Sequence, residues 1–235
     1  MAVSADERVP MKRIRVLLVE DHTVVREGLR ALLKVEDDIE VAGEARNGRE
    51  AVQLSEELLP DVVVMDIAMP RLNGFEATRQ VLKKVPATKV IILSAHSEDE
   101  YVEEVMAAGA AGYLVKQSAA NILVKAIREA YRGRTFFSPS ISRRLGDLRE
   151  RSISRGGKPR KGAARLTSRE VEVLQLIAEG MANKETAAQL GISIKTVEKH
   201  RQHLMNKLGI HDTAGLTRYA ISAGIIQTGG PITIE

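Results

Sequence analysis

Runs of apolar residues that end in charged or hydroxyl residues recur along the first half of the chain. Uninterrupted apolar runs are typical of strands covered on both faces, as in a parallel sheet packed between helices. The runs predict five strands, at Ile14–Val19, Ile39–Glu44, Val62–Asp66, Lys89–Leu93 and Gly112–Val115. Helical periodicity predicts five helices, at Thr23–Val35, at Arg49–Leu58, from the Asn73-Gly74 turn to about Lys84, at Glu98–Ala108 and at Ala119–Tyr131.

Strict alternation of strands and helices predicts a doubly wound α/β fold with a five-stranded parallel sheet. Right-handed crossovers leave few topologies for such a sheet. The flavodoxin-like strand order 2-1-3-4-5 is the one that brings the carboxyl ends of the first and third strands together.

That order places five polar residues on one rim of the sheet. Glu20 and Asp21 follow the first strand, Asp66 ends the third, Ser94 follows the fourth and Lys116 the fifth. Each alone could be a solvated strand end, but three crowded carboxylates repel one another and require a cation. Oxygen ligands with room for water and phosphate favour magnesium. Asp66 could then attack a phosphoryl group, with Lys116 and Ser94 holding the phosphate oxygens.

The segments VEDH, VVMDIAMP, ILSAH and YLVK resemble, in order, the motifs of the receiver domain of two-component response regulators. The resemblance implies that Asp66 accepts phosphate from a sensor histidine kinase. It implies a magnesium site formed by Asp21, Asp66 and the backbone carbonyl of Ala68, with Glu20 acting through water. It further implies three residues that respond to the phosphate: Ser94 as the switch hydroxyl, Lys116 as the phosphate-pairing amine and Tyr113 as the switch aromatic. Gln117 stands where many receivers have proline.

Composition changes this picture in three ways. Residues 1–137 carry a net charge of −3 and residues 138–235 a net charge of +7, which points to a polyanion-binding function in the C-terminal part. The absence of cysteine excludes disulfides, cysteine–zinc sites and cysteine nucleophiles. The N-terminus lacks the apolar core of a signal peptide, and no apolar run approaches a membrane span, so a cytoplasmic protein with no membrane partner is expected.

The C-terminal part begins with helix signals. Thr167 to Glu170 fits a capping box, and Gly180 ends the helix that follows. A short helix from about Lys184 to Leu190 and a longer one from Ile194 to Leu208 are joined by a tight turn at Gly191. Two helices joined in this way are a helix-turn-helix.

The longer helix has an apolar side and a polar side. Val197, Leu204 and Leu208 share the apolar side, whereas the opposite side carries polar residues at helical spacing: Lys195, Glu198, Lys199 and Gln202. Such a polar face could be merely solvated, but after a helix-turn-helix it indicates double-stranded DNA in the major groove. The predicted base contacts are Glu198, Lys199 and Gln202. The predicted phosphate contacts are Asn183, Lys195, Thr196, Arg201 and Lys207.

This region, including ISIKTVEKH, resembles the LuxR-type DNA-binding domain, and a receiver joined to it resembles the NarL/FixJ family of response regulators. The resemblance implies a closing helix from Asp212 to Ala223 that serves dimerisation. The predicted organisation is a disordered N-terminus at 1–11, a receiver at 12–133, a linker at 134–163, a LuxR-type domain at 164–228 and a tail at 229–235. The predicted function is a transcriptional regulator that forms a homodimer on phosphorylation.

Two other classes of function compete with this interpretation. In one, the receiver is an interaction scaffold that is never phosphorylated, although a scaffold has no need of crowded carboxylates. In the other, the protein is a magnesium-dependent phosphatase for external substrates. The sequence contains no evident substrate-pocket residues, and a phosphatase leaves the basic C-terminal half without a purpose. The protein is therefore predicted not to be an enzyme beyond slow loss of its own phosphate.

Overall fold

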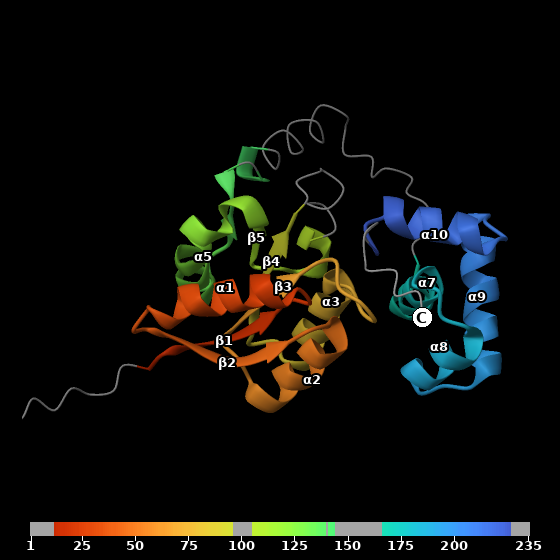
Figure 1. Cartoon of the computed structure of the whole chain (residues 1–235), viewed down its shortest axis with the longest axis horizontal. Helices are drawn as coiled ribbons and strands as arrows, with labels where there is room; N and C mark the ends of the chain where they lie inside the picture. The colour runs from red at the N-terminus through yellow and green to blue at the C-terminus, as the bar shows by residue number, and fades with distance from the viewer. Residues whose placement is uncertain (1–11, 96–104, 140, 144–165, 227–235) are drawn as a thin grey trace, which may run out of the picture.

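The computed structural model describes residues 12–95, 105–139, 141–143 and 166–226. They form an N-terminal α/β domain and a C-terminal helical domain (Figure 1). The predicted disordered N-terminus and C-terminal tail lie outside the described residues. None of the helices in the described ranges has the length and hydrophobicity of a membrane-spanning segment.

Six parallel strands form one sheet in the order β2-β1-β3-β4-β5-β6. The strands are β1 Ile14–Val19, β2 Ile39–Ala45, β3 Val62–Asp66, β4 Lys89–Ser94, β5 Gly112–Val115 and β6 Phe136–Phe137. The predicted α/β fold, the five predicted strands and their order 2-1-3-4-5 are confirmed. The sixth strand was not predicted, because two residues are too short to show any periodicity.

The N-terminal domain extends beyond the predicted boundary at residue 133. Strand β6 pairs with β5 through Phe136 and Phe137, and Ile141 is fully buried in the core of this domain. Residues 141–143 are helical, and residues 144–165 lie outside the described residues. The first part of the predicted linker therefore belongs to the folded domain.

Helices cover both faces of the sheet (Figure 1). Alternate residues of β1 point to opposite faces, so that Leu17 joins one apolar cluster and Leu18 the other. Helices α2 (Gly48–Leu58) and α3 (Gly74–Lys84) pack on the Leu17 face, and α1 (Thr23–Lys34) and α5 (Lys116–Tyr131) pack on the Leu18 face. Residues 105–108 are also helical, and most of the predicted Glu98–Ala108 helix lies outside the described residues.

Helix α5 begins at Lys116, three residues before the predicted start at Ala119. A proline at position 117 would disfavour helical geometry at Lys116, because the residue before a proline is pushed out of the helical region. Gln117 imposes no such restriction. The helix therefore begins at the residue whose side chain enters the rim of the sheet.

The C-terminal domain contains α7 (Ser168–Ala178), α8 (Asn183–Leu190), α9 (Ile194–Leu208) and α10 (Thr213–Ser222). The predicted capping box is present: Thr167 accepts from the Glu170 N–H, and Glu170 accepts from the Thr167 N–H. Gly191 and Gly209 end α8 and α9 in the left-handed conformation that glycine adopts without strain. The four helices enclose their own apolar core.

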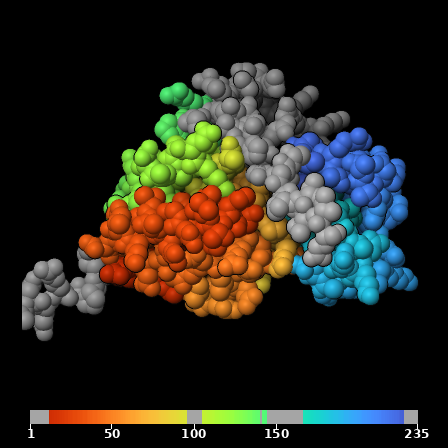
Figure 2. All heavy atoms as spheres, in the orientation of Figure 1, coloured from red at the N-terminus to blue at the C-terminus, as the bar shows by residue number. Residues whose placement is uncertain are grey.

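The two domains are in contact through α7, which packs against α3 and the loop between β3 and α3. The space-filling view shows the C-terminal helices as one body beside the body formed by the α/β domain (Figure 2). Gln175 on α7 is fully buried at this contact, although it does not belong to the apolar core of its own domain.

Candidate functional site

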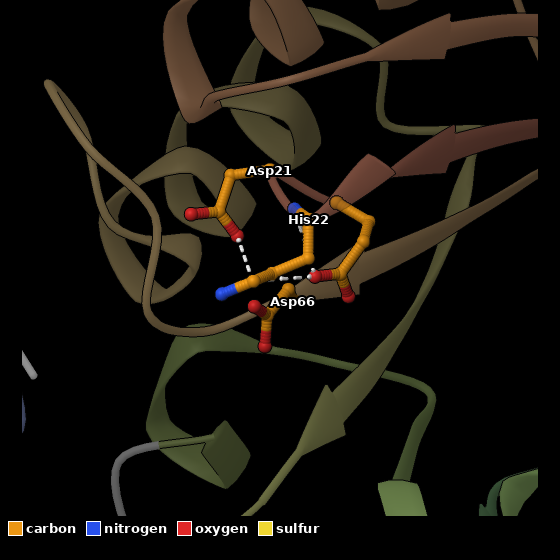
Figure 3. A group of neighbouring side chains, drawn as sticks. Asp21, His22 and Asp66 are labelled. Atoms are coloured by element: carbon orange, nitrogen blue, oxygen red, sulfur yellow. Dashed lines mark hydrogen bonds and ion pairs between the residues drawn. The ribbon is translucent and has the colours of Figure 1, made fainter. Parts of the chain in front are cut away.

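The carboxyl ends of β1 and β3 form an acidic pocket. Glu20 and Asp66 are buried, with 0% and 2% of their surface exposed, and Asp21 is half-buried beside them. Ligand atoms of Glu20, Asp21, His22 and Asp66 all lie within 4.8 Å of one another. Figure 3 shows the labelled side chains of Asp21, His22 and Asp66 converging from the two strand ends. The predicted meeting of the first and third strand ends therefore occurs.

Lys116 closes the pocket from the end of β5. Its Nζ lies 2.8 Å from Glu20 Oε2 and 2.9 Å from Asp66 Oδ2. Burial by itself would lower the pKa of Lys116, but the charges of Asp66 and Glu20 and their hydrogen bonds outweigh burial and raise that pKa. The amine is therefore a permanent cation between two buried carboxylates.

The carboxyl group of Asp66 has a raised pKa. Burial, followed by the charge of Glu20, raises the pKa of Asp66 from 3.8 to about 6, against the opposing effects of Lys116 and the Ile67 N–H. The Ile67 N–H donates to Asp66 Oδ1 at 2.8 Å and fixes the orientation of the carboxylate. At neutral pH Asp66 is mostly ionised, in a place where further positive charge would stabilise it.

The loop after β3 is held close to Asp66. The Gly74 N–H donates to the Ile67 carbonyl at 2.7 Å. A Cβ atom at Gly74 would collide with the carbonyl oxygen of Asp66, so that only glycine allows this approach. Ala68, whose carbonyl was predicted to bind the metal, lies in this loop and is half-buried.

Two predicted switch residues lie on the neighbouring strands. Ser94 ends β4, one position beyond Leu93, which pairs with Asp66, and it is almost fully buried. Tyr113 on β5 is fully buried in the apolar cluster beneath the rim. The structure thus brings Ser94 to the same rim as Asp66 and Lys116, and places the Tyr113 ring in the core.

Two further residues contact the acidic pocket, and one of them, Arg26, was not predicted there. His22 Nδ1 lies 2.9 Å from Asp21 Oδ1 and 3.2 Å from Glu20 Oε1. Arg26 is buried on α1, where its Nη1 donates to the Glu20 carbonyl at 2.8 Å. Arg26 occupies an inward position of α1, three residues before buried Leu29, and a cation on an apolar stripe is the signal that could have revealed it.

The donor set suits a hard divalent cation. Three carboxylates from two strand ends supply oxygen ligands, and the pocket is open to solvent at Asp21. His22 adds a nitrogen at the exposed side, where it bonds to two of the carboxylates. The buried negative charge, only partly balanced by Lys116, is the feature that a cation would stabilise.

The polar face of α9 is open to solvent. Four residues predicted to face DNA are exposed: Lys195, Glu198, Lys199 and Gln202. Val197 and Leu204, on the opposite side, are fully buried. Helix α9 lies on the side of its domain that is turned away from the sheet, with α7 between them (Figure 1). The contact between the domains therefore does not cover this face.

The other predicted phosphate contacts have partners within the domain. Arg201 donates to Asn183 Oδ1 at 3.4 Å and to Thr213 Oγ1 at 2.9 Å, which joins three helices. The Thr196 hydroxyl lies 2.8 Å from the side-chain hydroxyl that caps α9. Lys207 Nζ lies 2.6 Å from Glu170 Oε2, so Lys207 also fastens α9 to the start of α7.

Comparison with known proteins gives the same two parts. Residues 16–128 match the model of the response regulator receiver domain, and residues 164–220 match that of bacterial regulatory proteins of the luxR family. The chain is 40% identical to the transcriptional regulatory protein MctR of Rhizobium johnstonii, over 93% of this chain and 98% of that protein. It is 41% identical to the transcriptional regulatory protein LiaR of Bacillus subtilis, over 88% of this chain and 96% of that protein.

Solved structures agree with these matches. A two-component response regulator of the LuxR family from Aurantimonas has a TM-score of 0.57 at 36% identity, over 59% of this chain and 99% of that chain. The response regulator RcsB in complex with DNA has a TM-score of 0.54 at 27% identity, over 90% of this chain and 99% of that chain.

Proposed function

Because the chain belongs to the family of two-component response regulators that join a receiver domain to a LuxR-type DNA-binding domain, we propose that Asp66 is its phosphoacceptor and α9 its DNA-reading helix. The observation that carries the proposal is the buried Asp66 carboxylate, paired with Lys116 at 2.9 Å beside Glu20. The phosphoryl donor is a sensor histidine kinase. A regulator that binds chromosomal DNA acts in the cytoplasm.

The geometry of the pocket supports a direct phosphoryl transfer to Asp66. An oxygen of Asp66 attacks phosphorus, the phosphorus–nitrogen bond of the kinase phosphohistidine breaks, and the imidazole nitrogen keeps the bonding pair and takes up a proton. Glu20, Asp21, Asp66 and the carbonyl of Ala68 would hold Mg²⁺, which supplies charge neutralisation for the transferred group. Lys116 and Ser94 then bind phosphate oxygens, and Tyr113 responds to the new position of Ser94.

We expect no turnover of external substrates. The phosphoryl group remains on Asp66 until water removes it, and this slow loss ends the signal. A scaffold that is never phosphorylated is the alternative, but burying Glu20 and Asp66 side by side is unfavourable in a protein that makes no use of them.

The DNA-binding step requires two copies of the chain. One helix-turn-helix module makes too few contacts for high specificity, whereas a dimer reads two half-sites. In a solved structure, two RcsB dimers are bound to two parallel DNAs. By analogy, we propose that phosphorylation of this chain favours a homodimer on DNA.

The proposal is tested with acetyl phosphate and beryllofluoride, which mimics a phosphoryl group. Acetyl phosphate with Mg²⁺ should add one phosphoryl group to the intact mass of the protein. Beryllofluoride with Mg²⁺ should raise the dimer fraction in sedimentation and tighten binding to DNA selected from a random pool. An unchanged mass together with an unchanged sedimentation profile would refute the proposed function.

The base-reading role of α9 predicts a difference between two lysines. Lys199→Ala should relax base preference at one position, with a loss of about 1–3 kcal/mol of discrimination. Lys195→Ala should weaken binding to all DNA sequences alike. It should also reduce the slope of log affinity against log salt concentration by about one. Lys195 is the better control than Lys207, which is paired with Glu170. Binding of both variants to base-substituted DNA sites at several salt concentrations measures base preference and salt dependence. If Lys199→Ala lost the same affinity for every sequence, the proposed docking of α9 in the major groove would be contradicted.

A further inference from the structure

Helix α7 carries a polar stripe that lies outside the apolar core of its own domain. Glu172, Gln175 and Glu179 lie three and four residues apart on one side of the helix. Apolar residues on the other side of α7, among them Val173 and Ile177, fill the core of the C-terminal domain. In a separate domain this stripe would be solvated, but here Gln175 is fully buried and Glu172 is 6% exposed.

Two residues of the stripe, Gln175 and Glu179, bind the main chain of the loop that follows Asp66. Gln175 Nε2 donates to the Met69 carbonyl at 2.9 Å, and Gln175 Oε1 accepts from the Asn73 N–H at 2.8 Å. Glu179 accepts from the Arg71 N–H at 3.0 Å. Arg71 has a φ of 69°, a left-handed conformation that is unfavourable for a residue other than glycine. Two side chains of α7 thus fix three main-chain groups of a strained loop.

That loop begins at the phosphoacceptor. Ile67 donates to the Asp66 carboxylate, and Met69 is bonded to Gln175 only two residues further on. Asp66 is 2% exposed, so an incoming phosphoryl group needs space and hydrogen-bond donors from the adjacent main chain. A movement of the loop at Met69, Arg71 or Asn73 would break bonds to Gln175 or Glu179.

We propose that Gln175 is a positioning residue for the phosphoacceptor loop, through which the docked DNA-binding domain slows phosphorylation of Asp66 while leaving the DNA face of α9 open. The inference rests on the proposed function. Gln175 and Glu179 hold the loop in its unphosphorylated arrangement, so a rearrangement of the loop for phosphoryl transfer must also overcome these hydrogen bonds. Because the α9 face is exposed in the docked form, the contact controls the chemistry at Asp66 and not access to a DNA half-site.

The test compares Gln175→Leu with Gln53→Leu in the full chain. Gln53 is exposed on α2, where its side-chain amide donates to Glu57, so it provides the same change of chemistry away from the contact. With acetyl phosphate and Mg²⁺, Gln175→Leu should gain phosphate about fivefold faster than Gln53→Leu, which corresponds to a barrier lower by about 1 kcal/mol. Its radius of gyration in small-angle X-ray scattering should rise, and its affinity for a single DNA half-site should stay unchanged.

A second pair of samples tests the opposite change, in which a covalent link holds the two domains together and phosphate uptake is expected to slow. The chain has no cysteine, so Gln80→Cys and Glu172→Cys, at side chains that bond at 2.8 Å, can be joined by a short bismaleimide. The joined protein should gain phosphate more slowly than the same double variant capped with a monomaleimide. Equal rates within both pairs would overturn the inference. Absence of phosphate uptake in every sample, Gln53→Leu included, would instead overturn the proposed function.

Discussion

Asp66→Asn is expected to abolish phosphoryl uptake from acetyl phosphate. An amide is not a nucleophile toward phosphorus, and its neutral side chain removes one of the three carboxylates that attract the cation. The amide carbonyl of the substituted side chain can still accept from the Ile67 N–H, and Lys116 keeps its ion pair with Glu20. The variant should therefore fold, and intact-mass measurement should show no added phosphoryl group.

Asp37→Asn is the matched control. Asp37 is exposed at the turn before β2, away from the acidic pocket, and its substitution changes the net charge by the same amount. It should take up phosphate at the wild-type rate. Equal labelling of both variants would show that another residue is the acceptor, and peptide mapping of the label would then identify it.

The acidic pocket could be predicted because its residues stand at the ends of strands. Once alternating strands and helices fix the sheet order, every carboxyl end lies on one rim, and Asp66, Lys116 and Ser94 must share it. His22 follows Asp21 directly and is therefore expected beside the rim, but the same reasoning could not place Arg26, which lies on α1. Its position depends on how far the first turn of α1 reaches over the end of β1, and periodicity does not report that distance.

The C-terminal domain was predictable for a different reason. The ends of its helices are marked in the sequence by the Thr167–Glu170 capping box and by Gly191 and Gly209. These ends depend on local hydrogen bonds and backbone conformation, which the nearby residues determine. The partners of Lys207 and Arg201 could not be predicted. A long cation on a helix can reach a neighbouring helix as well as a phosphate, and only the packing of the helices decides between these options.

The contact between the domains left no trace in the sequence pattern. Gln175 and Asn73 are about a hundred positions apart, and a glutamine on the polar side of a helix is what a solvated face would also carry. This glutamine becomes buried only when two domains that are already folded pack against each other. Such contacts are few, polar and reversible, and these are the properties that a regulated interface needs.

Lys116→Met is expected to have the second large effect, on stability. It removes the cation that lies 2.8 Å from Glu20 and 2.9 Å from Asp66, and leaves two buried carboxylates facing each other. Removing one partner of a buried ion pair costs about 3–5 kcal/mol, and the lower end applies because the Lys116 side chain is 23% exposed. Lys83→Met, on the exposed last turn of α3, is the matched control.

The loss of stability in Lys116→Met should depend on pH and on the magnesium concentration. The pKa of Asp66 is already raised to about 6, and removal of Lys116 raises it further, so the folded variant binds protons more tightly than the unfolded chain. Its deficit in unfolding free energy relative to the wild type should therefore be small below the ordinary carboxyl pKa of 3.8, where Asp66 is protonated in both states, and should grow as pH rises through about 6. Added Mg²⁺ would occupy the position of the missing charge and should stabilise Lys116→Met more than Lys83→Met. Urea unfolding across this pH range, with and without Mg²⁺, measures both effects, and equal stabilisation of the two variants by Mg²⁺ would mean that the acidic pocket is not where the cation binds.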